Sequence, residues 1–320
     1  MAPATSLMDS HILVEPDVNA PSAISVRGLT KSYGDVQVLR GIDLDMAEGE
    51  VLAIVGPNGA GKTTLVEILE GFRNADGGTA TVLGAEPSRP TQEWRARIGI
   101  VLQTCQVPPE LTVAELVQRF AGYYPAPRGV SETLDLVGLG DRRDARAGTL
   151  SGGQQRRLDV AMALVGDPEL LFLDEPTTGF DPSARHQAWS VISRLRSIGK
   201  TILLTTHSME EAEALADRVA VVVGGQVVAE GTPETLGGRD RLPATIRFRL
   251  PAGVDGKQLP DEGSGAHVSR GDHVEIARAD LACLGGLVDW ARDRDLDLPG
   301  LTVERPTLED VYLQLTGGVR

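Results

Sequence analysis

Hydrophobic and polar residues follow two different rhythms along most of this chain. Short apolar runs, such as VLAIV at 51–55, LLFLD at 170–174 and TILLTT at 201–206, are typical of strands buried on both faces of a parallel sheet. Between such runs, apolar residues recur three and four positions apart, which predicts amphipathic helices. This alternation extends over residues 22–236 and predicts an α/β domain.

The last part of the chain follows a different pattern, which predicts a small α+β domain at 241–320. The string GGRDRLPA at 237–244 indicates a linker, because it combines glycine, proline and charge. Strands are expected at ATIRFRL, HVEIARA and LTVERP, and a final helix at TLEDVYLQL. A further helix around ADLACLGGLVDWARDRDL is expected to present one apolar face. The residues of this face are Leu281, Leu284, Leu287, Val288 and Ala291.

The composition and charge of the chain argue against several classes of protein. The chain has 320 residues and a net charge of -14, which argues against broad contact with the phosphates of a nucleic acid. Its two cysteines, Cys105 and Cys283, are too few for a disulfide framework. Residues 1–21 show no periodicity and are expected to form a flexible arm without a signal peptide. No apolar run is long enough to span a membrane, so a cytoplasmic protein is expected.

The segment GPNGAGKTT directly follows the apolar run VLAIV and matches the pattern of a phosphate-binding loop. Glycines allow backbone N–H groups to turn toward phosphate oxygens, and the helix that begins there adds its positive end. We expect Lys62 to reach the β- and γ-phosphates and the Thr63 hydroxyl to hold Mg²⁺. An ordinary glycine-rich turn would not explain the Lys-Thr pair. The predicted nucleotide-binding residues are Gly56, Pro57, Asn58, Gly59, Ala60, Gly61, Lys62, Thr63 and Thr64.

Several chemically active side chains follow predicted strands, where open α/β sheets bind their ligands. Asp174 and Glu175 come at the end of LLFLDEP; Asp174 is placed to reach a metal, and Glu175 to accept a proton from an attacking water. His207 ends TILLTTH, and Gln103 ends IGIVLQ, where a neutral amide can contact metal or water. Tyr33, in KSYG, offers a ring on which a base can stack, although packing is the more common role of such a residue.

A second turn, LSGGQ at 150–154, stands at the head of a predicted helix. Ser151 can cap the helix, while Gly152 and Gly153 leave its N–H groups open to an anion. An ordinary capped helix explains the same residues, because an apolar stripe follows. The stripe consists of Leu158, Ala161, Leu164 and Val165. Anion binding and capping are compatible with each other.

Taken in chain order, KSYG, GPNGAGKTT, VLQ, LSGGQ, LLFLDEP, GFDP and TTH closely resemble the motifs of ABC transporter ATPases. The resemblance covers roughly residues 22–236 and implies a P-loop NTPase core with a helical subdomain at about 104–150. In the family, the surface of this subdomain receives a cytoplasmic helix of the transmembrane partner. The resemblance implies that Tyr33 stacks on adenine, that Gln103 and Asp174 complete the metal environment and that Glu175 is the catalytic carboxylate. It also implies that His207 contacts the γ-phosphate and that Asp181 communicates across a dimer.

The same resemblance gives the second turn a role. In the family, residues equivalent to Ser151, Gly152, Gly153 and Gln154 contact the ATP held by the opposite subunit. One complete motif set therefore implies a homodimer, or a pair with a similar ATPase subunit, with ATP and Mg²⁺ as cofactors.

The subfamily follows from two longer segments. RRLDVAMALVGDPELLFLDEPTTGFDPSAR and PTLEDVYLQLTG resemble the daunorubicin-resistance type, found in drug and lipid exporters whose membrane subunits are separate chains. This implies an ATPase that powers export through a separate membrane permease. The ATPase is expected in the cytoplasm, peripheral on the inner face of the membrane, where the permease holds it. The alternative is a soluble ABC-type ATPase acting on nucleic acid or the ribosome. The acidic charge and the lack of a coiled-coil insertion argue against it.

Overall fold

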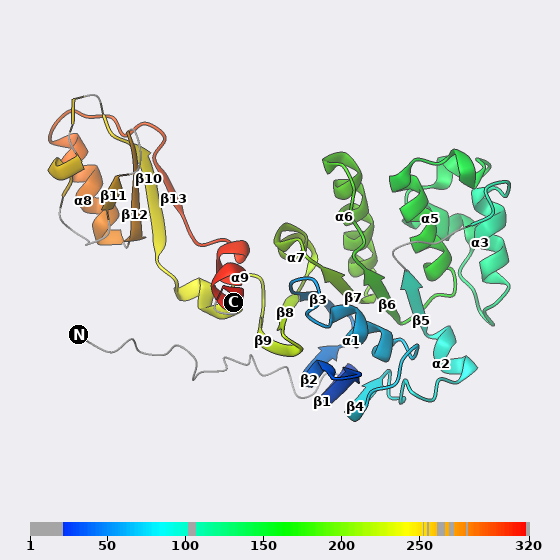
Figure 1. Ribbon diagram of the computed structural model, residues 1–320. Helices are drawn as coiled ribbons and strands as arrows, with labels where there is room; N and C mark the ends of the chain where they lie inside the picture. Colours follow the sequence, from blue (N-terminus) through cyan, green and yellow to red (C-terminus); the bar gives the residue numbers. More distant parts are fainter. Residues whose placement is uncertain are drawn as a thin grey trace. The chain divides into compact units, whose positions relative to one another are not determined.

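The protein is described by a computed structural model in which the chain forms two compact units, one ending at Pro233 and one beginning at Glu234 (Figure 1). No helix among the described residues is long and apolar enough to cross a membrane. The structure describes residues 22–101, 107–251, 253–254, 256–260, 266–268, 272–279 and 281–317.

A six-stranded sheet forms the centre of the first unit. Its order is β5-β6-β7-β3-β8-β9, and every neighbouring pair is parallel except β8 and β9. The strands are β3 (Val51–Val55), β5 (Ile98–Val101), β6 (Leu170–Asp174), β7 (Thr201–Thr206), β8 (Arg218–Val223) and β9 (Gln226–Gly231). Every residue of β3 and β7 is buried, which confirms the α/β fold with strands covered on both faces.

A second, antiparallel sheet lies beside the first and has the order β2-β1-β4. It consists of β1 (Ser22–Tyr33), β2 (Val36–Ala47) and β4 (Gly77–Val82). One hydrophobic cluster contains Ile24 of this sheet, Leu65 of α1 (Lys62–Leu69) and Phe172 of β6. Helix α1 therefore lies between the two sheets, and this packing fixes the position of the loop that precedes it.

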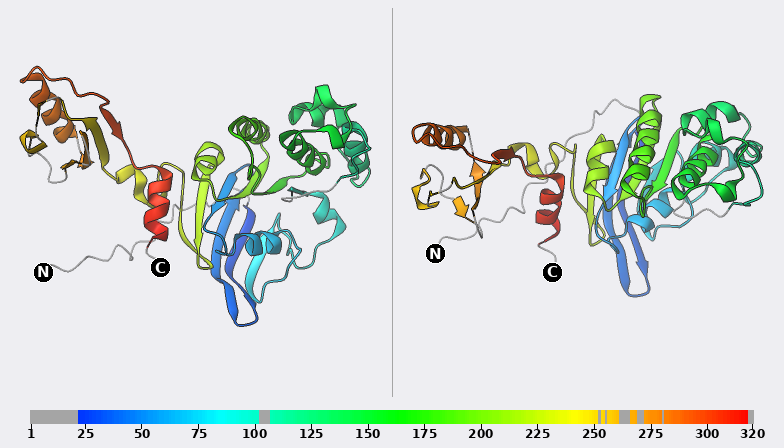
Figure 2. Two further views of the ribbon diagram at one scale, coloured as in Figure 1. Left: turned by 45° about the horizontal axis from the view of Figure 1, so that its top comes forward. Right: turned by 90° about the horizontal axis from the view of Figure 1, so that it is seen from above.

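The remaining helices of this unit flank the sheets. They are α2 (Gln92–Ala96), α3 (Val113–Ala121), α4 (Val130–Leu136), α5 (Gly152–Leu164), α6 (Pro182–Ser197) and α7 (Met209–Leu215), with short 3₁₀ turns at Gly140–Arg142 and Ala147–Thr149. Helix α3 begins with a capping box between Thr112 and Glu115. It contacts α4 and α5, and both views of Figure 2 show these green and teal helices together at one end of the unit.

The stripe predicted on α5 is buried. Leu158, Ala161, Leu164 and Val165 each have 0% of their surface exposed, so this helix is anchored through its apolar face. The helical region predicted at about 104–150 contains α3 and α4, and the structure adds α5 to the same bundle.

The second unit is built around a four-stranded antiparallel sheet of order β11-β12-β10-β13. Its strands are β10 (Ala244–Arg249), β11 (Ala266–Val268), β12 (His273–Ala279) and β13 (Thr302–Glu304); its helices are α8 (Leu281–Arg292) and α9 (Leu308–Thr316), with a 3₁₀ turn at Gly256–Gln258. The strands and helices that the sequence predicts are present, and the short strand β11 is an addition.

The apolar face of α8 differs in part from the sequence prediction. Leu287 and Ala291 are buried as predicted and Leu284 packs against the same core, whereas Val288 is 42% exposed. Cys283 and Trp290 are buried in addition, and the side chain of Leu281 lies outside the described residues.

Most of the predicted linker is a 3₁₀ segment, Leu236–Arg241. A side chain at Gly237 would lie 2.6 Å from Val311 of α9, so this segment packs on the last helix.

Candidate nucleotide-binding and catalytic site

The phosphate-type loop connects β3 to α1, and close packing requires glycine at two of its positions, Gly56 and Gly61. A Cβ atom at Gly56 would lie 2.2 Å from the carbonyl oxygen of Val222. Gly61 has a φ of +103°, and a Cβ there would lie 2.8 Å from Leu39. Residues 57–59 are exposed, so the open side of the loop faces outward at the carboxyl edge of the sheet.

Lys62 lies along the inside of this loop. Its Nζ donates hydrogen bonds to the carbonyl oxygens of Gly56 (2.7 Å) and Pro57 (3.2 Å), and the residue is only 6% exposed. Burial lowers the pKa of Lys62, while the negative charges of Glu175 and Asp174 oppose this effect. The predicted phosphate-binding cation and the two predicted acids therefore form one electrostatic cluster.

The two acids are held by β7, the strand next to β6. The Thr205 hydroxyl donates to Oδ1 of Asp174, and the backbone N–H of Glu175 donates to the Thr205 carbonyl at 3.1 Å. Glu175 has a φ of +43°, which is uncommon for a residue other than glycine. This backbone turn directs consecutive side chains, Asp174 and Glu175, into different positions at the strand end.

The carboxylate of Glu175 is joined by the predicted histidine. Nδ1 of His207 lies 3.5 Å from Oε1 of Glu175, and the Thr178 hydroxyl donates to Oε2 at 3.0 Å. The side chain of Glu175 is 16% exposed, and that of His207 is 55% exposed. This pair can orient a water molecule beside a phosphate, with Glu175 as the proton acceptor. Gln103, the other predicted residue of this group, lies outside the described residues.

A buried arginine connects the acid strand to α5, and the sequence reasoning missed it. Arg156 Nη2 donates to the carbonyl oxygen of Asp174 at 2.9 Å, and its Nε donates to that of Pro176 at 3.3 Å. Arg156 is 7% exposed. Buried arginines are uncommon, but only the tertiary structure shows that this one holds the backbone on both sides of Glu175.

The second turn has the geometry of a capped helix. The Ser151 hydroxyl accepts from the Gln154 N–H at 3.3 Å, and the Gln154 side chain accepts from the Ser151 N–H at 3.0 Å. Ser151 and Gly152 are exposed, and nothing lies within 4 Å of a Cβ built on Gly152. Within the described part of the chain, no hydrogen bond or ion pair joins this turn to residues 56–64.

Two further predicted site residues, Asp181 and Tyr33, are exposed. Asp181 is exposed and caps α6 by accepting from the Ala184 N–H at 3.0 Å. Tyr33 is 41% exposed, and the guanidinium of Arg73 lies 5.2 Å from its ring centroid. Arg73 is itself held by Glu67 of α1, at 2.6 Å. Sequence reasoning identified Tyr33 but not the cation on its ring.

The described donors suit a magnesium ion bound together with phosphates. Thr63 provides a hydroxyl and Asp174 a carboxylate, and Mg²⁺ is commonly bound by one or two such protein oxygens plus substrate oxygens. Among the residues with described positions, no group of three or more His, Cys, Asp or Glu side chains forms a metal cage. An all-protein site is therefore absent from this part of the chain, and Thr63 and Asp174 fit a nucleotide-linked metal.

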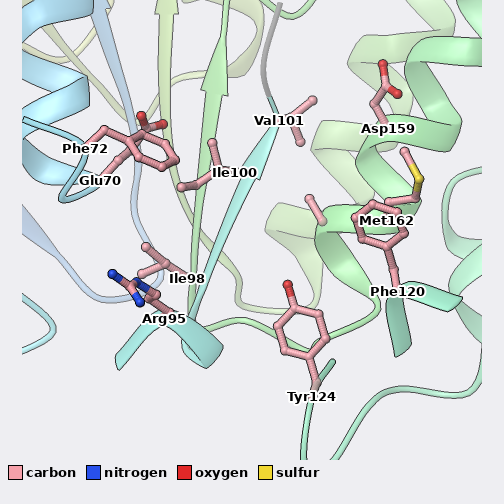
Figure 3. A pocket seen from close by; sticks show the side chains of 11 residues that line it. Glu70, Phe72, Arg95, Ile98, Ile100, Val101, Phe120, Tyr124, Asp159 and Met162 are labelled. Carbon is pink, nitrogen blue, oxygen red and sulfur yellow. The ribbon is translucent and has the colours of Figure 1, made fainter. Parts of the chain in front are cut away.

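A pocket of about 310 Å³ opens between the sheet and the helical bundle (Figure 3). Burial raises the pKa of Glu70 to about 8 and that of Asp159 to about 6. The lining residues are Glu70, Phe72, Arg95, Ile98, Ile100, Val101, Phe120, Tyr124, Asp159, Met162 and Ala163. No motif marks these residues, because they come from separate elements.

Comparisons with known proteins agree with the order and geometry of the motifs. A family model described as ABC transporter matches residues 39–178, and one described as the C-terminal domain of ABC transporter domain-containing protein-like chains matches 244–307. The Nod factor export ATP-binding protein I of Burkholderia orbicola is 40% identical over 301 residues, which cover 92% of this chain and 97% of that protein. A daunorubicin resistance ATP-binding protein of Streptomyces coeruleorubidus is 38% identical over 309 residues, which cover 94% and 98%.

The first unit also has solved structural relatives. The structure of cbiO1 from Clostridium perfringens, part of the ABC transporter complex cbiONQ, matches with a TM-score of 0.61 and 29% identity. The match covers 67% of this chain and 89% of that one. Members of this family hydrolyse ATP to power transport. The motifs, the fold and relatives aligned along nearly the whole chain show that this protein belongs to the ATP-binding subunits of ABC transporters.

Proposed function

We propose that this chain hydrolyses ATP to power the export of a drug, lipid or other amphiphile through a separate membrane permease. The observation that carries the proposal is the full-length similarity to one protein named for Nod factor export and another named for daunorubicin resistance. Both alignments include the second unit, which a match to the ATPase core alone would not. These relatives favour a role in transport over the alternative, a soluble ABC-type ATPase that acts on nucleic acid or the ribosome.

The residues of the site take the following roles in this proposal. Lys62 and the backbone of residues 56–64 bind the phosphates of ATP, and Thr63 and Asp174, with Gln103, hold Mg²⁺. Tyr33 stacks on the adenine. Glu175 accepts the proton of the attacking water, and His207, 3.5 Å from Glu175, contacts the γ-phosphate. When bound by these residues, Mg²⁺ would supply positive charge to the phosphate oxygens.

Two chains complete each catalytic site in this proposal. Ser151 and Gly152 are exposed, and α5, which begins at this turn, gives it a positive helix end. The turn therefore suits the ATP that is bound to a second subunit. Asp181, which caps α6, is also exposed and can contact that subunit. The partner is a second copy or a similar ATPase, and the assembly is peripheral on the cytoplasmic face of the membrane, bound through the permease and without nucleic acid.

Subunit complementation tests this two-chain site. Lys62→Ala removes phosphate binding from one copy, and Ser151→Arg blocks the turn that serves the other copy. Each variant alone should lack ATPase activity. An equimolar mixture of the two should recover about a quarter of the wild-type rate, because half of the dimers are mixed and each holds one intact site.

A second mixture provides the control. A mixture of wild type with an inactive carrier protein at the same total concentration sets the rate expected from dilution. If both variants stay inactive after mixing, while each still folds and Ser151→Arg still binds ATP, the shared site is wrong.

A further inference from the structure

A buried acid lies behind the pair formed by Glu175 and His207. Glu211 of α7 is 1% exposed, and its Oε1 accepts hydrogen bonds from the Thr177 hydroxyl at 2.7 Å and from the Trp189 indole N–H at 3.1 Å. Acids are rarely buried this deeply, because a carboxylate that leaves water must be compensated by donors from the protein. The two hydrogen bonds therefore tie Thr177 and Trp189 to α7.

The side chain of Glu211 holds the turn that follows Glu175. Thr177 is buried, and its carbonyl oxygen accepts from the Phe180 N–H at 3.1 Å. The next residue, Thr178, donates through its hydroxyl to Oε2 of Glu175 at 3.0 Å and through its N–H to the Glu175 carbonyl at 3.3 Å. A displacement of Thr177 would therefore move the hydroxyl that orients the Glu175 carboxylate.

The backbone of Glu211 belongs to the turn that follows His207. Its N–H donates to the Ser208 hydroxyl at 3.2 Å, and the Ser208 N–H donates to the Thr206 hydroxyl at 3.0 Å. His207 lies between these two bonded residues, and its side chain is 55% exposed, with Nδ1 3.5 Å from Oε1 of Glu175. Because more than half of the imidazole is exposed, the backbone of this turn sets its position.

The third segment held by Glu211 is α6, which packs against α7 (Figure 1). Trp189 of α6 is buried, and Asp181 caps the start of the same helix. A second link between the two helices lies at the surface, where Nη1 of Arg185 on α6 is 3.0 Å from Oε2 of Glu210 on α7. The side chain of Glu210 is 64% exposed, so this acid can be compared directly with its buried neighbour.

We propose that Glu211 is a positioning residue for ATP hydrolysis, which fixes the distance between His207 and Glu175 by holding the turns that follow them. The inference rests on the hydrolytic roles proposed above for these two residues. Glu211 acts through Thr177 and through the start of α7, and it is not a ligand of the nucleotide. Its loss should therefore lower kcat and leave the affinity for ATP nearly unchanged.

Two substitutions at Glu211 test the positioning role. Glu211→Leu removes the acceptor and should lower kcat about 10- to 100-fold, because a misplacement of about 1 Å can cost about 100-fold. Glu211→Gln keeps a carbonyl oxygen for both donors and should retain kcat within about threefold of the wild type. The KM for ATP should change less than about twofold in both variants. Rates are measured on the full chain and divided by the amount of fluorescent ATP analogue bound, so that a loss of folded protein does not lower kcat.

Glu210→Gln is the matched control, because it makes the same chemical change on the same helix and breaks the surface link to α6. It should leave kcat unchanged. Thr177→Val removes the hydroxyl that donates to Glu211 and should lower kcat as Glu211→Leu does. The double variant Glu211→Leu, Thr177→Val should be no slower than the slower single variant, which is the result expected when two residues act through one contact.

The outcomes separate the positioning role from the proposed function. If the wild-type chain hydrolyses ATP and Glu211→Leu has the same kcat, the positioning role is overturned while the ATPase chemistry stands. Equal losses of kcat in Glu211→Leu and Glu211→Gln would also overturn it, because the acceptor would then not be the cause. If Glu211→Leu does not fold, a wild-type kcat in Thr177→Val leads to the same conclusion. A wild-type chain that hydrolyses no ATP, alone or with its permease, would refute the proposed function and the inference with it.

Discussion

Replacing Glu70 by glutamine should remove much of the loss of stability that the first unit undergoes as the pH rises. Glu70 is 7% exposed, and burial, followed by the charges of Asp174 and Glu67, raises its pKa to about 8 from an ordinary value of 4.5. The folded chain therefore keeps a proton that the unfolded chain has already released between these two pH values. The contribution of Glu70 to the free energy of unfolding is fully present below pH 4.5 and is lost as the pH rises through about 8.

The size of the effect follows from this difference. Each pH unit within the window corresponds to about 1.4 kcal/mol, so between pH 6 and pH 9 the wild-type chain should lose about 2 to 3 kcal/mol through this one group. Above pH 9 the loss should level off, because Glu70 is then ionised in both states. The glutamine variant has a similar shape and no proton to release, so its stability should not contain this contribution.

Urea denaturation at pH 6, 7, 8 and 9 measures the effect, and tryptophan fluorescence can be made specific for the first unit. The chain has three tryptophans; Trp94 and Trp189 are buried in the first unit, and Trp290 lies in the second. Both proteins are therefore compared in a Trp290→Phe background. If the two stabilities differ by the same amount at every pH, the protonated state assigned to Glu70 is refuted.

Three further predictions concern the ATPase reaction. Glu175→Gln should retain ATP binding and lower kcat roughly 10²- to 10⁴-fold, with a nucleotide-bound dimer accumulating in sedimentation analysis; a normal kcat would exclude Glu175 as the base. Arg156→Met should lower kcat with a smaller change in KM for ATP, since two buried carbonyl oxygens beside Glu175 lose their donor; an unchanged kcat would contradict this positioning role. Arg73→Ala should weaken ATP binding a few-fold while Arg73→Lys preserves it, because the cation rests on the Tyr33 ring; equal affinities in a fluorescent nucleotide titration would remove Arg73 from the base site.

Local chemistry allowed the sequence to determine the ATPase motifs and most strands. The loop at 56–64 needs glycines, a lysine and a threonine next to one another, and this requirement is visible without a fold. Buried parallel strands are equally visible, because both of their faces are apolar. The sequence was less successful on α8, where it assigned Val288 to the core in place of Trp290, since apolar spacing alone does not show which side of a helix meets a sheet.

Tertiary structure decided the contacts between residues far apart in the chain. The pairing of β6 with β7 brings His207 to Glu175, the packing of α5 brings Arg156 to the carbonyl oxygens around it, and the same helix places Asp159 in the pocket opposite Glu70. Ordinary acids and bases take on these roles through burial and neighbouring charges, which only the folded chain provides.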